Sequence, residues 1–169
     1  MNRLETIINQ RIIILDGAMG TMLQSYKLSE SDFRGKRFAE IEGMMKGNSD
    51  LLNLTRPDVV SDIHRRYLLA GADLITTNTF SGQRISQADY HLEAYCREIN
   101  LEGARLARKM ADESSTPDKP RFVCGSVGPT NKTCSMSPDV SNPALRSLTY
   151  DELFDAYAEQ IDALIDGGV

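Results

Sequence analysis

Short apolar runs alternate with longer amphipathic segments along this chain, and that alternation restricts its fold more than any other feature. The apolar runs are 12–15, 74–77 and 122–125. Apolar residues at helical spacing occur in the segments between and after them, at 57–70, 86–110 and 149–166. This order predicts an α/β fold with parallel strands, because each helix returns the chain to the same edge of the sheet.

Local signals mark the ends of two of the predicted helices. Pro57 stands where a helix would begin, and Gly71 can cap its end. Thr149 and Glu152 have the spacing of a capping box, and the glycines that follow residue 166 would end that last helix. These two helices are therefore expected to start and stop close to those residues.

The first third of the chain is less regular. A short helix is expected over residues 2–10, and the run 12–15 is expected to be a strand buried on both faces, ended by the glycine-containing turn 16–21. Residues 25–56 are polar and irregular. Long loops inside compact domains are usually functional, so we expect a functional loop there.

A polar segment stands at or just past the end of each of the three predicted strands. These segments are 16–21, 76–80 and 128–133. The carboxyl ends of parallel strands meet at one rim of a sheet, which is where α/β proteins bind ligands. The carboxylate of Asp16 can hold an ammonium group, and the hydroxyls and amide of 76–80 can bind a small polar substrate. Together the three segments predict a binding site at that rim.

Each of these segments also has a simpler interpretation. Asp16 can bond its own backbone in a glycine turn, and the side chains of 76–80 can bond the nearby backbone at the end of a strand. The segment 128–133 can be a surface loop ordered by its proline. The sequence alone leaves these alternatives open, although three such segments on one rim favour a site.

The cysteines and histidines do not suggest a metal centre. A zinc site needs three or four ligands, usually with closely spaced pairs, whereas Cys96, Cys124 and Cys134 are far apart in sequence. Cys96 is expected to pack on a helix and Cys124 in a strand, with Cys134 in a loop. His64 and His91 are expected to be surface or hydrogen-bonded histidines. We therefore name no catalytic residue and no metal ligand.

Composition argues against several classes of protein. The chain has 169 residues with 19 Lys plus Arg and 24 Asp plus Glu, a formal net charge of −5, which disfavours a nucleic-acid binder. No apolar run approaches the roughly 18 residues of a membrane span, and the first residues lack a signal-peptide pattern. Three cysteines fit a reducing compartment. We expect a cytoplasmic protein that contacts neither nucleic acid nor membrane.

A set of ordered motifs resembles the N-terminal homocysteine-binding domain of cobalamin-dependent methionine synthases, a branch of the homocysteine S-methyltransferases. The resemblance covers residues from about 10 to 169. The matching segments are LDGAMGTM at 15–22, FRGKRF at 33–38, KGNSDLL at 46–52, AGADLITTNTF at 70–80, GPTNKT at 128–133 and SPDV at 137–140.

The resemblance implies a fold and a domain. Its fold is the (β/α)₈ TIM-type barrel, which typically needs about 250 residues. We therefore expect residues 1–169 to form an N-terminal fragment of the homocysteine-binding barrel, truncated after about three βα units. A sheet that stops there has an open edge, so self-association through that edge is also expected.

The resemblance also implies an activity and its partners. Methylcobalamin, recharged by 5-methyltetrahydrofolate on another domain, gives its methyl group to homocysteine, whose thiol is bound by zinc on cysteines of later strands. Zinc and cobalamin are thus expected in the full-length family and neither is expected on this fragment. The partners are homocysteine, the remaining barrel and the folate and cobalamin domains.

The resemblance assigns half of a substrate pocket to this chain. Asp16 matches an aspartate near the substrate amino group, Gly17 a glycine whose backbone faces the substrate, and Thr77 a threonine that holds the amino-acid end. Asn78, Thr79 and Asn131 follow from their position on the same rim. The fragment by itself is expected to be inactive.

Two alternatives remain. The chain can belong to a homocysteine S-methyltransferase that uses a different methyl donor, or it can be a non-catalytic module that associates with itself.

Overall fold

The computed structural model describes residues 3–169 and combines helices with a small parallel sheet. Strands β1 (Leu74–Thr76) and β2 (Phe122–Cys124) pair in parallel, with Leu74 opposite Phe122. Leu15 forms a parallel bridge to Leu74 on the other side of β1. The predicted parallel α/β arrangement is confirmed for these three segments.

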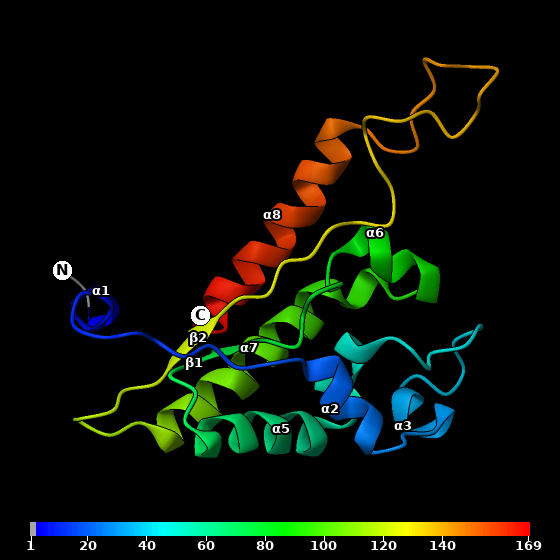
Figure 1. The fold of residues 1–169 in the computed structure, drawn as a ribbon. Coiled ribbons are helices and arrows are strands. Elements are labelled where there is room, and N and C mark those ends of the chain that lie inside the picture. The colour runs from blue at the N-terminus through cyan, green and yellow to red at the C-terminus, as the bar shows by residue number, and fades with distance from the viewer. Residues whose placement is uncertain (1–2) are drawn as a thin grey trace.

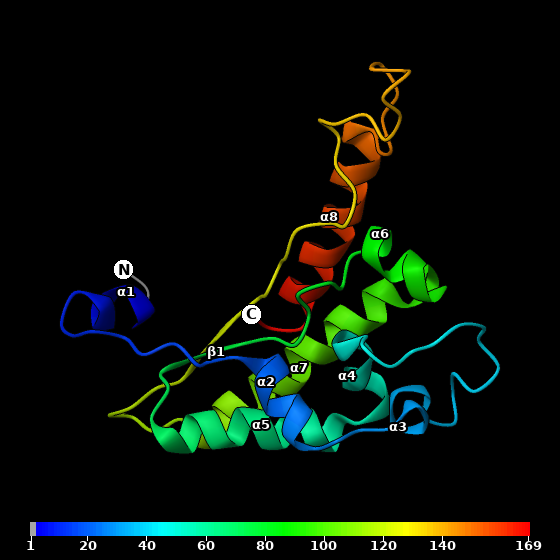
Figure 2. The same cartoon turned by 45° about the vertical axis from the view of Figure 1, so that its right-hand side comes forward.

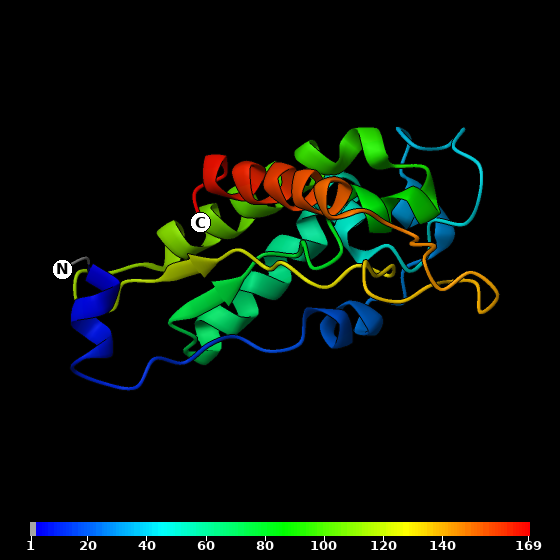
Figure 3. The same ribbon diagram turned by 90° about the horizontal axis from the view of Figure 1, so that it is seen from above.

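The helices lie mainly to one side of the strands. Figures 1 and 3 show α7 and α8 side by side along the sheet, with residues 11–18 running along the far edge of β1. The helices are α1 (Arg3–Ile8), α2 (Met19–Ser25), α3 (Glu30–Arg34), α4 (Leu52–Thr55), α5 (Pro57–Ala70), α6 (Arg84–Gln87), α7 (Cys96–Ser114) and α8 (Tyr150–Asp166), with 3₁₀ turns η1 (Ser49–Leu51), η2 (Ala88–Tyr90) and η3 (Glu93–Tyr95).

The helix-end signals act as predicted. Pro57 is the first residue of α5, and Gly71 ends it with a left-handed φ of 113°, a conformation that costs glycine little. The Thr149 hydroxyl accepts the Glu152 backbone N–H at 3.2 Å while the Glu152 carboxylate accepts the Thr149 N–H at 2.8 Å. α1 confirms the helix expected over 2–10 for the residues described, and residue 2 lies outside them.

The predicted helix over 86–110 is wrong in its first third. The chain forms α6, η2 and η3 in succession before α7 begins at Cys96. His91 has a φ of 56°, which a continuous right-handed helix cannot contain. The apolar spacing over 86–95 therefore reflects separate turns that bury Leu92, and not one long helix.

The first predicted strand is not buried on both faces. Ile14 O accepts the N–H groups of Asp73 and Leu74 at 2.8 and 3.1 Å, so the segment runs beside β1. However, Ile12 is 87% exposed and Leu15 is 52% exposed. The predicted strand over 12–15 is therefore reduced to a single bridge at Leu15, beside a sheet of two strands, and no described element covers these side chains.

The first segment is fastened to β1 through Asp73. The Arg11 guanidinium donates to both Asp73 carboxylate oxygens at 2.7 and 2.8 Å, and Ile14 N–H donates to the same group at 3.0 Å. The Arg11 hydrogen bonds outweigh burial and lower the pKa of Asp73 to about 2. The carboxylate therefore stays charged and holds the edge segment in register.

Residues 25–56 are more ordered than a polar loop. They contain α3, η1 and α4, and α2 begins before them at Met19. Phe38, Met45 and Leu51 are fully buried in the main core, together with side chains of α5 and α7. Their spacing is irregular because each residue enters the core from a turn, which hides the pattern in the sequence.

A long arm joins β2 to α8. Figures 1 and 2 show it extending beyond the N-terminal end of α8. It corresponds to the loop predicted over 128–143, and Val140 within it is almost fully exposed. Across residues 3–169, no helix has both the length and the apolar character to cross a membrane.

Candidate functional site

A polar cleft of about 520 Å³ opens where β1 ends. Parallel α/β sheets bind ligands at this rim because the strand-to-helix loops converge there. The cleft is lined by Met19, Gly20, Gly47, Asn48, Ser49, Asp50, Thr76, Thr77, Asn78, Thr79, Phe80, Ser81, Ser86, Asp89, Tyr90, Ser126 and Asn131. Four of the predicted site residues therefore lie together here, namely Thr77, Asn78, Thr79 and Asn131.

Thr77 and Thr79 are buried and tie the end of β1 to the loop after β2. Thr77 Oγ1 accepts the Ser126 N–H at 2.9 Å, and the Thr79 hydroxyl donates to Ser126 O at 2.9 Å. Their two hydroxyl oxygens lie 2.6 Å apart. Since Thr79 uses its proton on Ser126, Thr77 donates to Thr79. The hydroxyls thus fix the floor of the cleft.

Asn78 holds one wall of the cleft against that floor. Its amide Nδ2 donates to Ser49 O at 2.7 Å and to Asn53 Oδ1 at 3.2 Å. Asn53 Nδ2 donates back to Asn78 O at 2.8 Å. Both amide protons of Asn78 are therefore bound by residues of a distant segment, and the simpler interpretation of bonding to nearby backbone does not hold for this side chain.

Asp50 is a buried carboxylate in the cleft that the sequence analysis did not single out. It is 4% exposed, and its Oδ2 accepts the Ser81 N–H at 2.7 Å. Burial raises the pKa of Asp50 to about 7. The segment 46–52 was notable in sequence only for its resemblance, because nothing local distinguishes a buried aspartate from an exposed one.

A second acidic group lies on the opposite wall. The Asp89 carboxylate accepts the Asn131 Nδ2–H at 2.6 Å, which connects η2 to the loop after β2. The burial of Tyr90 and the negative charges of Asp89 and Asp50 together raise the pKa of its phenol. Two carboxylates, a phenol and several hydroxyls therefore surround a cavity of about 520 Å³, a lining suited to a polar ligand that carries an ammonium group.

Asp16 and Gly17 lie beside the cleft and outside its lining. The Asp16 carboxylate accepts the Thr76 backbone N–H and the Thr76 hydroxyl, each at 2.9 Å. Burial raises the pKa of Asp16 although these hydrogen bonds act in the opposite direction. A side chain at Gly17 would meet the Tyr67 hydroxyl at 3.0 Å, so the glycine permits a close approach.

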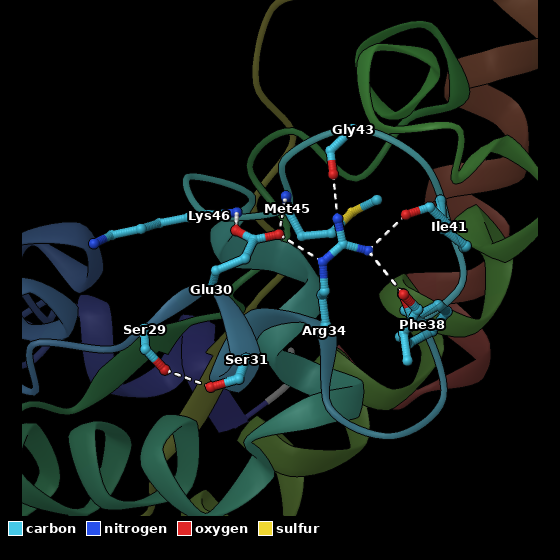
Figure 4. Close-up of polar contacts among 10 residues, drawn as sticks. Ser29, Glu30, Ser31, Arg34, Phe38, Ile41, Gly43, Met45 and Lys46 are labelled. Atoms are coloured by element: carbon cyan, nitrogen blue, oxygen red, sulfur yellow. Dashed lines mark hydrogen bonds and ion pairs between the residues drawn. The ribbon is translucent and has the colours of Figure 1, made fainter.

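An arginine–glutamate pair shapes the loop that leads to the cleft wall. Figure 4 shows the Arg34 guanidinium enclosed by this loop, where it donates to Phe38 O at 3.1 Å, Ile41 O at 2.6 Å and Gly43 O. Its Nε donates to Glu30 at 2.8 Å. We call Glu30 and Arg34 the loop clamp.

The Glu30 carboxylate extends the loop clamp toward the cleft. It accepts the backbone N–H groups of Met45 and Lys46 at 2.8 and 2.7 Å. Gly47 and Asn48 follow directly and line the cleft. Asn48 Nδ2 in turn donates to Gln87 Oε1 at 2.7 Å. The clamp therefore fixes the backbone immediately before the cleft wall.

The histidine predictions are partly wrong. His64 is fully buried on the core face of α5, and neither ring nitrogen has a hydrogen-bond partner among residues 3–169. Burial lowers the pKa of His64 to about 4. Val60 and Leu68 lie four residues to either side on the same face, a spacing that indicates burial. His91 is exposed as expected.

The cysteines do not assemble into a zinc site. Cys96 is buried as predicted, and burial raises the pKa of its thiol to about 12. Cys124 is exposed, so its predicted place in the core is wrong, because it lies on β2 where no described element covers it. Within residues 3–169 no three His, Cys, Asp or Glu side chains form a metal-binding group. The residues present do not fit the implied zinc ion.

A parallel α/β fold with a polar cleft at the carboxyl ends of its strands is typical of ligand-binding domains. The sequence model of the homocysteine S-methyltransferase family matches residues 13–169. The chain therefore belongs to the homocysteine S-methyltransferase family.

Solved structures support the same fold. The chain resembles homocysteine methyltransferase MmuM from Escherichia coli in its oxidized form, with a TM-score of 0.72 and 21% identity, over 100% of this chain and 55% of that one. The metallated form gives a TM-score of 0.71 and 20% identity, over 99% and 55%. The chain thus spans about half the length of these proteins.

Proposed function

We propose that this chain supplies part of the substrate pocket of a homocysteine S-methyltransferase. The observation that carries the proposal is the polar cleft at the carboxyl end of β1, in a chain that matches the family over residues 13–169. In the reaction a methyl group passes to the homocysteine sulfur, giving methionine. We assign the binding of the amino-acid end to the residues of the cleft.

Carboxylates next to the cleft suit the ammonium group of homocysteine. Asp50 lies in the lining with a pKa raised to about 7, so a bound ammonium would stabilise its charged form. Asp16 is the ammonium partner that the resemblance implies, and it sits behind Thr76. The two aspartates are therefore separate candidates for the same role, and variants can distinguish them.

The remaining predicted residues position the ligand by shaping the cleft. Thr77 and Thr79 fix the floor, and Asn78 fixes the wall that carries Ser49. Asn131 directs the Asp89 carboxylate on the far wall. Because Gly17 has no side chain, the Tyr67 ring can lie close to the backbone of Gly17. We propose these six predicted residues, with Asp50 and Asp89, as the homocysteine side of the pocket.

We further propose the cobalamin-dependent branch of the family, in which residues 1–169 form the N-terminal part of a barrel. The motifs at 33–38 and 128–133 support this branch over donors of other kinds. Methylcobalamin would then supply the methyl group. A thiolate is the nucleophile in such a transfer, and no residue of this chain is assigned to thiol activation because none fits the zinc ion.

Calorimetric titration with L-homocysteine tests the proposal. We expect saturable binding that strengthens from pH 6 to pH 8, as Asp50 becomes ionised. If Asp50 is the ammonium partner, Asp50→Asn should remove this pH dependence. Asp16→Asn should then lower the affinity for homocysteine and leave the pH dependence in place. Asp118→Asn, at an exposed position far from the cleft, is the matched control. Absence of saturable binding by the unaltered chain would contradict the proposal.

A further inference from the structure

A second hollow, of about 560 Å³, adjoins the cleft. The two cavities share Gly20, Gly47 and Ser49 in their linings. The apolar part of its lining is formed by Leu23, Leu28 and Phe33, which are buried residues of the main core. The hollow therefore lies against the cleft, and its floor is formed by side chains that are packed in the main core.

Two lysines stand at this hollow. Lys27 and Lys46 both line it and are exposed, and they are its only charged lining residues. None of the ion pairs found within residues 3–169 includes either of them, whereas nine of the arginines described are paired with carboxylates. In a chain of net charge −5, two unpaired ammonium groups at one cavity are a local positive centre. We call it the lysine hollow.

Lys27 has an unusual backbone conformation, and Lys46 lies beside the loop clamp. Lys27 follows α2 with a φ of 49°, a left-handed conformation that non-glycine residues seldom adopt. Glu30 binds only the backbone N–H of Lys46, and Figure 4 shows the Lys46 side chain extending away from the loop clamp. The carboxylate of Glu30 is taken up by Arg34. The ammonium of Lys46 thus has no carboxylate partner within the described chain.

The chemistry of the lysine hollow suits an anion. Two ammonium groups supply charge, while the Gln24 amide and the Ser49 hydroxyl supply neutral donors at the same cavity. The cleft next to it carries the carboxylates of Asp50 and Asp89 and would repel such a group. The two neighbouring cavities therefore favour ligand groups of opposite charge, cationic in the cleft and anionic in the lysine hollow.

We propose that the lysine hollow binds a multiply charged anion of phosphate or carboxylate groups. Anion binding does not depend on the proposed function, whereas the identity of the neighbouring ligand as homocysteine does. The shared wall of Gly20, Gly47 and Ser49 would place the anion beside the bound homocysteine. The hollow thus provides an anion subsite next to the cleft.

NMR titration of backbone amides tests the proposal, with tripolyphosphate and citrate as separate probes at low salt. We expect saturable shifts at Gly20, Gln24 and Gly47 with at least one probe. Lys27→Gln and Lys46→Gln should each weaken binding about threefold, and the double variant about tenfold. Binding should also weaken as KCl is added. The tighter probe identifies the anionic group as phosphate or carboxylate.

Lys109→Gln is the matched control, since Lys109 is an exposed lysine on α7 outside the hollow. It should leave anion binding unchanged, and all variants should keep the thermal midpoint of the unaltered chain. No saturable shift with either probe, or equal weakening by Lys109→Gln, would overturn the proposal. A separate L-homocysteine titration distinguishes this failure from failure of the proposed function.

Discussion

The Asp16 carboxylate accepts two hydrogen bonds from Thr76, one from the backbone N–H and one from the hydroxyl, each at 2.9 Å. This contact joins the edge segment of the sheet to the last residue of β1, at the lip of the cleft. Asp16 therefore supports the cleft from outside, whatever its role toward the substrate.

Removing one of these hydrogen bonds should loosen the edge segment. Thr76→Val keeps the shape of the side chain and removes the hydroxyl donor, so we expect the free energy of unfolding to fall by about 1–2 kcal/mol. The pKa of Asp16, followed by NMR, should rise further because a bond to the charged form is lost. Thr76→Ser retains the hydroxyl and should lose less. An unchanged pKa in Thr76→Val would contradict the account.

Asp50 and His64 should oppose each other in the pH dependence of stability. The folded pKa of Asp50 is about 7, above its ordinary value, so its contribution is lost as pH rises through 7. The folded pKa of His64 is about 4, below its ordinary value, so the folded state loses stability as pH falls from about 6.5 toward 4. Each contribution, integrated over its full range of pH, is on the order of 3–4 kcal/mol.

Urea unfolding between pH 5 and 6.5 separates the two groups. Relative to the unaltered chain, Asp50→Asn should make stability rise more steeply with pH, and His64→Leu should make it fall. Leucine also fills the buried site without an unpartnered polar atom, so His64→Leu should not lower stability at pH 5. Slopes that change in the same direction in both variants would contradict the assigned burial effects.

The loop clamp should control the order of the cleft wall. Arg34→Gln removes the charge that holds Glu30 and the loop carbonyls, so the amides of Met45 and Lys46 should exchange with solvent at least tenfold faster. Homocysteine affinity should fall while the thermal midpoint changes little. Arg37→Gln, which breaks the exposed pair with Glu98, is the control. Unchanged exchange in Arg34→Gln would show that the wall is held by other contacts.

The open edges of the sheet should make the chain associate with itself. Exposed apolar side chains lie on the edge segment and on α8, among them Ile12, Ile14, Phe154 and Ile165. Such surfaces mark interaction sites or aggregation-prone regions. We expect sedimentation velocity to show a concentration-dependent increase in mass, reduced by Ile14→Lys. Lys substitution at the exposed Leu69 of α5 is the control, and a monomer at all concentrations would refute this prediction.

Elements with strong local signals were predictable from the sequence. α5 begins at Pro57 and ends at Gly71, and α8 begins after the capping box of Thr149 and Glu152. These signals act within a few residues and need no tertiary structure. The convergence of the loops after the strands followed from parallel topology, which brought Thr77, Asn78, Thr79 and Asn131 to one cleft.

Features that depend on distant contacts were missed. Asp50 becomes a buried carboxylate only because residues 47–50 fold over the end of β1, where Ser81 binds it. The left-handed turn at His91 interrupts an apolar pattern that looks continuous in sequence. The lysine hollow joins two lysines that are 19 positions apart on separate segments. No local pattern could reveal any of these.

Backbone amide mapping by NMR with L-homocysteine tests the central claim most directly. The account predicts saturable shifts confined to the segments that line the cleft, at 19–20, 47–50, 76–81, 86–90 and 126–131, with the exposed face of α8 unaffected. Shifts confined to α8, or no saturable shift at any concentration up to the solubility of the ligand, would contradict a homocysteine site in this cleft.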